Sequence, residues 1–279
     1  MSLRVAGVDL AAEAAGTAVA VLRVDVEAGD RGEAGESGGA SVVLESLRLG
    51  ADDEALLAAT RDVRLFGIDC AFGWPVDFVD FVSRHAASVE REAAGGGVQP
   101  AAPTPALPAT GDLAWRRRLA HRETDRVVTE RTGARPLSVA TDRLGMTALR
   151  CAVLLDRLAG DGRVVDRSGE HPSAVVEVYP AMALRVWGLA RPGYKLTPDA
   201  RAALIADLCR AAPWLELGDH RALMTASADA LDAVLAALVA LAHAREASIV
   251  PEPHQRQRAR VEGWIAIPTV GLAELGAIL

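Results

Sequence analysis

The stretch that most constrains the fold is SADALDAVLAALVALA, residues 227–242, which is apolar at almost every position. A helix that is apolar nearly all round is either buried in a large core or spans a membrane. The longest run without a polar residue, 233–242, has only ten residues, too few to cross a bilayer. The sequence therefore predicts a helix over 228–245 that is buried in the core of a soluble protein.

The rest of the chain alternates between strand-like and helix-like segments. Apolar, β-branched runs predict five strands, at 3–10, 16–26, 41–49, within 63–75 and at 173–180. Apolar periodicity predicts helices at 51–60, 76–89, 113–132, 143–159, 181–188 and 198–212, and the tail 262–268 is expected to add a short strand. This order is typical of an α/β fold, with a mixed five-stranded sheet flanked by helices.

We expect one domain over residues 1–279. Residues 94–111 are rich in glycine and proline and predict a flexible loop, and residues 113–135 predict an arginine-rich helical insertion. The formal net charge of −7 argues against a protein that coats nucleic acid non-specifically. Cys70, Cys151 and Cys209 have no metal-binding spacing, which favours reduced thiols in a cytoplasmic protein.

Two predicted buried strands each end in an aspartate. Asp9 follows the apolar run Val5–Val8, and Asp69 closes the run in VRLFGIDCAFGWP, residues 63–75. A charge in a dry core is costly unless it is paired or binds a metal, and the carboxyl ends of parallel strands are favoured ligand sites. The alternative is that each aspartate only caps the turn after its strand.

The buried helix carries two further carboxylates, Asp229 and Asp232, which share one helical face. An aspartate such as Asp229 is common in the first turn of a helix, where the helix dipole favours negative charge. Asp232 has almost no polar surface within reach and is predicted to face inward. Carboxylates that converge from two strand ends and a helix would suit Mg²⁺ or Mn²⁺, because such ions prefer hard oxygen ligands. A bound ion of this kind can activate water against a phosphodiester.

Several segments together resemble a family of predicted RNase H-like nucleases that is classed as a domain of unknown function. They are GVDLA, GTAVAVL, LFGIDCAFGWP, RETDR, LSVATDRLGMTALR, VVEVYPAMALRVWGL, ADALDAVLAALVA and EGWIAIP, and they cover residues from about 4 to 268. The parent superfamily, with RNase H and the RuvC-type resolvases, carries acids on the first strand, the fourth strand and a late helix. The resemblance implies an RNase H-like fold with Asp9, Asp69, Asp229 and Asp232 as metal ligands.

Arginines near the predicted site are candidates for phosphate contacts. Residues 115–135 contain seven arginines and three acids, and Arg118, Arg122 and Arg126 fall at helical spacing, with Arg143 in a second Asp-Arg pair. Guanidinium groups suit phosphate oxygens, although a solvated helix face or buried ion pairs would give the same pattern. Glu177, near the end of a buried strand, is either a further metal ligand or general base, or the partner of an arginine such as Arg143.

The favoured hypothesis is a metal-dependent nuclease that hydrolyses phosphodiester bonds of nucleic acid. One alternative is an ATP-dependent phosphotransferase or ATPase of the related actin-like fold, since GVDLAAEAAGTAVAVL is loosely similar to a phosphate loop; no second copy of that motif is visible. Another is a non-catalytic relative that binds nucleic acid or protein. The only lysine, Lys195, is expected to lie in an exposed loop without a specific role.

Overall fold

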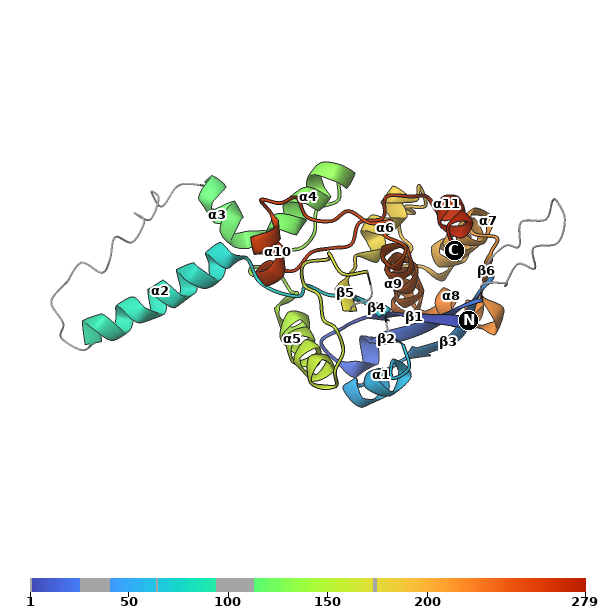
Figure 1. The fold of residues 1–279 in the computed structure, drawn as a ribbon, viewed down its shortest axis with the longest axis horizontal. Helices are drawn as coiled ribbons and strands as arrows, with labels where there is room; N and C mark the ends of the chain where they lie inside the picture. Colours follow the sequence, from blue (N-terminus) through green and yellow to red (C-terminus); the bar gives the residue numbers. More distant parts are fainter. Residues whose placement is uncertain (1, 26–40, 64, 94–112, 173–174) are drawn as a thin grey trace.

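A computed structural model describes residues 2–25, 41–63, 65–93, 113–172 and 175–279 of the chain. Its centre is a mixed sheet of six strands in the order β5-β4-β1-β2-β3-β6 (Figure 1). The strands are β1 (Ser2–Asp9), β2 (Ala18–Asp25), β3 (Ser41–Leu49), β4 (Leu65–Asp69), β5 (Val175–Glu177) and β6 (Leu215–Glu216). The predicted α/β class and mixed sheet are confirmed, with one strand more than expected.

The sheet combines an antiparallel meander with parallel neighbours on both sides. β1 pairs antiparallel with β2, and β2 pairs antiparallel with β3. β4 lies parallel to β1, and β5 lies parallel to β4. The carboxyl ends of β1 and β4 therefore lie side by side in the middle of the sheet, which is where a ligand site is favoured.

Helix α9 (Ala228–Ala244) covers one face of the sheet, and α1 (Asp53–Ala59) and α5 (Gly145–Gly160) cover the other (Figure 1). Every residue from Ala230 to His243 in α9 is buried, as expected for a helix that is apolar all round. Alternate residues of β1 belong to different cores: Val5 packs on the α9 side, whereas Ala6 and Val8 pack on the α5 side. By the same alternation, Gly7 and Asp9 belong to the α9 face.

The remaining helices lie around these two layers. They are α2 (Val76–Ala93), α3 (Leu113–Ala120), α4 (Glu123–Thr132), α6 (Pro180–Val186), α7 (Pro198–Ala211), α8 (Arg221–Ala226), α10 (Arg256–Glu262) and α11 (Leu272–Ala277), with short 3-10 turns η1 (Ala14–Gly16) and η2 (Gly218–His220). No helix within the described residues is long and apolar enough to span a bilayer.

Two predicted elements differ from the structure. The helix predicted over 113–132 is broken into α3 and α4, because Arg122 adopts an extended backbone and Asp125 accepts a hydrogen bond from its N–H at 2.9 Å. The predicted strand at 262–268 is not regular; Ile265 forms an isolated bridge to Glu177, and Pro268 forms one to Ser248. The loop predicted at 94–111 lies outside the described residues, whereas the arginine-rich insertion at 113–135 contains α3 and α4.

Candidate functional site

Asp9 and Asp69 are direct neighbours at the ends of β1 and β4. The parallel register pairs Asp9 with Asp69 and Gly7 with Gly67, so both strands end in the same Gly-x-Asp sequence. Residues two apart in a strand point to the same face, and this face is covered by α9. Both carboxylates are half-buried, at the point where the sheet opens into a pocket.

The two glycines allow α9 to approach this end of the sheet. A Cβ on Gly7 would overlap the backbone of Ala233 and Ala237 in α9, and one on Gly67 would meet Val178 and the Ala236 carbonyl. Glycine is the residue that permits such contact between backbones. The repeated Gly-x-Asp sequence was therefore a signal for both the acid and the helix packed above it.

Helix α9 brings Asp232 to the same region. The Asp232 side chain is only 1% exposed, as its position on the apolar helix predicts, and Asp229 is half-buried in the first turn, which Ser227 caps. One Asp232 oxygen, Oδ2, lies 2.7 Å from the Lys195 ammonium and 3.5 Å from the Tyr194 hydroxyl. The other, Oδ1, is buried with no hydrogen-bond partner among the described residues.

Burial is the main influence on the electrostatics of these acids, and their mutual repulsion adds to it. Burial, followed by the negative charges of Asp69 and Asp232, raises the pKa of Asp9 to about 9. Burial and the charge of Asp232 raise the pKa of Asp69 to about 7, against a lowering effect of Lys195. The pKa of Asp232 is also raised by burial, although Lys195 opposes the shift. These carboxylates interact with one another, and one ammonium does not compensate them.

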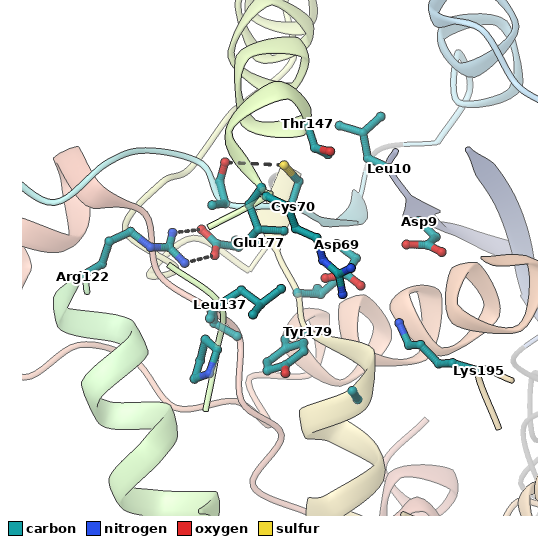
Figure 2. A pocket seen from close by; sticks show the side chains of 17 residues that line it. Asp9, Leu10, Asp69, Cys70, Arg122, Leu137, Thr147, Glu177, Tyr179 and Lys195 are labelled. Carbon is teal, nitrogen blue, oxygen red and sulfur yellow. Dashed lines mark hydrogen bonds and ion pairs between the residues drawn. The ribbon is translucent and has the colours of Figure 1, made fainter. Parts of the chain in front are cut away.

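The acids open onto a pocket of about 380 Å³. Figure 2 shows the side chains of Asp9, Asp69 and Lys195 directed into the same space. Besides Asp9 and Asp69, the charged lining residues are Arg122, Arg143, Glu177 and Lys195. The remaining lining is mostly apolar and includes Leu10, Leu137 and Tyr179. The cavity is large enough for a small ligand or one unit of a polymer.

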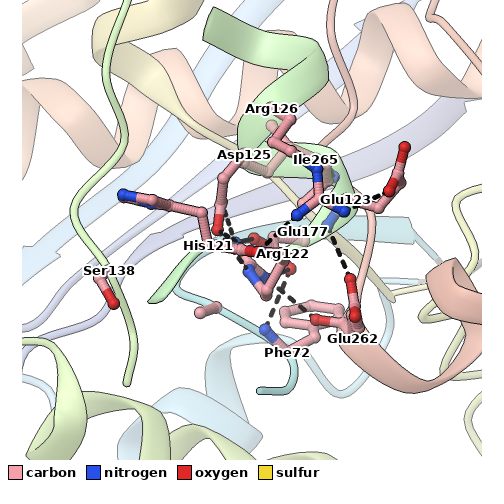
Figure 3. Close-up of polar contacts among 12 residues, drawn as sticks. Phe72, His121, Arg122, Glu123, Asp125, Arg126, Ser138, Glu177, Glu262 and Ile265 are labelled. Carbon is pink, nitrogen blue, oxygen red and sulfur yellow. Dashed lines mark hydrogen bonds and ion pairs between the residues drawn. The ribbon is translucent and has the colours of Figure 1, made fainter. Parts of the chain in front are cut away.

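Glu177 lies in the pocket wall, but its carboxylate is fully engaged (Figure 3). Arg122 donates to both of its oxygens, at 2.7 and 2.8 Å, and the Phe72 N–H donates to Oε2 at 3.0 Å. The same guanidinium also binds both Asp125 oxygens, at 2.9 and 3.2 Å. Of the two predicted roles for Glu177, the structure shows the pairing with an arginine. The partner is Arg122, not Arg143.

The predicted phosphate-binding arginines are in different environments. Arg143 is exposed and lines the pocket, whereas Arg118 is exposed on α3 and is not a lining residue. Arg122 is buried in its ion pairs. Arg126 pairs with Glu123 and donates to the His121 carbonyl at 3.0 Å. Of the four, Arg143 is the one with a solvated guanidinium group at the pocket.

The donor set at Asp9 and Asp69 fits a divalent cation. The described residues contain no group of three or more acidic, histidine or cysteine side chains arranged to hold an ion together, so Asp232 does not join Asp9 and Asp69 on one ion in this arrangement. However, the two strand-end carboxylates are hard oxygen donors. Their raised pKa values and the orphaned Asp232 Oδ1 show that the cluster would gain from added positive charge.

The fold and site define an α/β protein with a carboxylate cluster at the carboxyl ends of two central parallel strands. The chain belongs to the family described as protein of unknown function (DUF429), whose model matches residues 7–256. This range includes all four predicted acids and Lys195. No curated protein and no solved structure gives a significant match to the chain.

Proposed function

We propose that this protein is a metal-dependent nuclease of the RNase H-like superfamily. The observation that carries the proposal is the register pairing of Asp9 with Asp69 at the ends of adjacent parallel strands, with Asp232 buried on the helix that packs over them. First strand, fourth strand and late helix are the positions that the resemblance implies for catalytic acids.

Asp9 and Asp69 would hold the ion, Mg²⁺ or Mn²⁺, with Asp229 and Asp232 completing the negative site. When bound, such an ion supplies an activated water and stabilises the oxygen that leaves the phosphorus. Hydrolysis then adds water across one P–O bond, and the leaving oxygen acquires a proton.

A nucleic-acid substrate needs local positive charge, because the chain as a whole carries −7. Arg143 offers an exposed guanidinium group at the pocket, and α3 exposes Arg116, Arg117 and Arg118. Guanidinium groups bind phosphate oxygens in a forked geometry. We propose that Arg143 contacts the phosphate next to the cleaved bond and that the α3 arginines contact the strand further away.

The test is cleavage of single-stranded, double-stranded, hybrid and branched substrates by the purified protein with Mg²⁺ or Mn²⁺. We expect cleavage of at least one substrate, its loss with a chelator, and its loss in Asp9→Asn. Asp156→Asn is the matched control, because Asp156 is an exposed carboxylate on α5, outside the pocket; it should retain full activity.

Two results would overturn the proposal. One is a wild-type protein that cleaves no substrate with either ion. The other is equal cleavage by wild type and Asp9→Asn, which would assign the activity to a contaminant or to another site. Circular dichroism of both variants must match that of wild type, so that a lost activity is not a lost fold.

A further inference from the structure

Lys195 is the only lysine in a chain with 29 arginines, and it lies at the carboxylate cluster. Its ammonium is 2.7 Å from Asp232 Oδ2, and its side chain lines the pocket with Asp9 and Asp69 (Figure 2). The side chain is 53% exposed although its partner is 1% exposed. One side of the ammonium is therefore bound to a buried acid, and the other faces the pocket.

The loop that carries Lys195 is fixed to the start of α9. Buried Arg201 donates to the Tyr194 carbonyl at 3.0 Å, and to the carbonyls of Thr225 and Ala226 at 2.7 and 3.0 Å. Residues 225 and 226 lead directly into α9, which carries Asp229 and Asp232. The backbone next to Lys195 is thus held against the segment that leads into α9, the helix of Asp229 and Asp232. This attachment places the Lys195 ammonium beside Asp232.

The chemistry of an ammonium suits this position better than that of a guanidinium group. An ammonium is a compact point charge with three donors, whereas a guanidinium group is a wide planar fork. A compact ammonium can take the position of a metal ion next to a carboxylate and leaves more of the pocket open than a guanidinium group does. This difference in size gives a physical reason for a lysine at this position in a chain that otherwise uses arginine.

The acids divide into two pairs around this cation. Asp9 and Asp69 are neighbours across the sheet, and Asp229 and Asp232 are neighbours on α9. Lys195 is bound to the helical pair, through Asp232, and no ion pair of Asp9 or Asp69 is found within the described residues. The strand pair therefore has room for an added cation, whereas the helical pair already holds one.

On the basis of the proposed function, we propose that Lys195 is a built-in second cation, so that the site binds one divalent ion, at Asp9 and Asp69. The ammonium takes the position at Asp232 that a second ion would otherwise occupy. The arrangement differs from a two-ion site, in which both pairs of carboxylates hold metal.

The test counts bound Mn²⁺ by electron paramagnetic resonance, in wild type and in Lys195→Met, which keeps an unbranched side chain up to the ε position and removes the charge. We expect one ion per wild-type chain and two per Lys195→Met chain, because Asp229 and Asp232 become available as ligands. Lys195→Arg keeps a charge at Asp232 and should bind one ion. In the double variant Lys195→Met/Asp232→Asn the count should return to one.

The outcomes separate this inference from the proposed function. Two ions on the wild-type chain would refute the role of Lys195 and leave the nuclease proposal standing. One ion on both wild type and Lys195→Met would refute the role of Lys195 as well. No ion on the wild-type chain would refute the metal site itself, and the inference with it. If Lys195→Met does not fold, Lys195→Gln replaces it with the same expected count of two.

Discussion

Two buried ionic clusters border the same pocket, and they differ in how far the chain neutralises them. In the first, Arg122 is held between Glu177 and Asp125 and donates to all four of their carboxylate oxygens. In the second, the carboxylates of Asp9, Asp69 and Asp232 are accompanied by one ammonium, from Lys195, and Asp232 Oδ1 has no hydrogen-bond partner among the described residues.

The difference separates a structural cluster from a candidate site. A buried charge network that is fully satisfied fixes one arrangement of the chain; here it joins β5, α4 and the turn after β4. A network that lacks positive charge leaves its carboxylates uncompensated and is a candidate binding site for a cation. Burial alone does not distinguish the two clusters, because both contain carboxylates with little exposure.

The largest effect is expected from removing the cation of the satisfied cluster. Arg122→Met leaves Glu177 and Asp125 buried without their partner, and breaking a buried pair in this way costs about 3–5 kcal/mol. We expect this loss in the free energy of unfolding, measured by urea denaturation. Arg126→Met is the control: its pair with Glu123 is partly exposed, and such pairs contribute about 1 kcal/mol or less. Equal losses in both variants would contradict the comparison.

An intermediate effect is expected when the missing charge is supplied to the second cluster. A ligand that binds only the folded state stabilises it by about 2.7 kcal/mol at a concentration 100 times its Kd. Saturating Mn²⁺ should therefore raise the Tm of wild type, by roughly 2–4 °C for each kcal/mol of stabilisation that the bound ion contributes. A chelator should reverse the rise. Asp9→Asn should respond much less. A wild-type Tm that does not change with Mn²⁺ would contradict a metal role for the cluster.

A smaller effect, of opposite sign to that of Arg122→Met, is expected from Asp9→Asn without metal. The pKa of Asp9 is raised to about 9, against about 3.9 for an unfolded chain. The folded state retains a proton that the unfolded chain releases, so stability is highest below about pH 4 and falls as the pH rises through about 9. Asp9→Asn removes this penalty.

Solvent screening at the half-buried Asp9 reduces the effect well below what the full pKa difference implies. We therefore expect the chelated Asp9→Asn variant to be more stable than wild type at pH 8 by about 1 kcal/mol, which is a Tm rise of roughly 2–4 °C. The difference should vanish as the pH falls to about 3, below the unfolded pKa of about 3.9, where Asp9 is protonated in both the folded and the unfolded states. Thermal melts of wild type, Asp9→Asn and Asp156→Asn at both pH values measure it. A variant that is less stable than wild type at pH 8 would show that Asp9 is satisfied in the native chain.

The sequence predicted the acids of the second cluster because their positions are set locally. Asp9 and Asp69 end strands whose apolar runs are continuous in the sequence, and the burial of Asp232 follows from the helical periodicity around it. The burial of α9 as a whole was predictable for the same reason. These features depend on residues within one or two turns of each other.

The sequence could not predict contacts between distant segments. Arg122 and Glu177 are 55 positions apart, so the sequence around either residue does not indicate that the two form an ion pair. The break between α3 and α4 lies at Arg122, the residue whose side chain binds Glu177. The sequence predicts no role for Lys195, because its loop has no periodicity and its partner Asp232 lies on a separate element. The six-residue α8 and the two-residue β6 are too short for a pattern.

The smallest effect is expected at the pocket edge, where Arg143 and Arg118 separate two positions for phosphate contact. Both are exposed, but only Arg143 lines the pocket. Removing one phosphate contact lowers the slope of log K against log salt by about 1. With Ca²⁺ in place of Mg²⁺ to hold the substrate uncleaved, Arg143→Gln should weaken binding and lower this slope while the Tm stays unchanged.

Arg118→Gln gives the matched comparison, since it removes the same charge from α3 outside the pocket. If Arg143 contacts the phosphate next to the cleaved bond, Arg143→Gln should lower kcat as well as affinity, whereas Arg118→Gln should affect affinity alone. The reverse pattern would move the cleaved bond towards α3 and away from the Asp9 and Asp69 carboxylates. The kinetics of these two variants therefore test whether the cluster that lacks positive charge is where the substrate reacts.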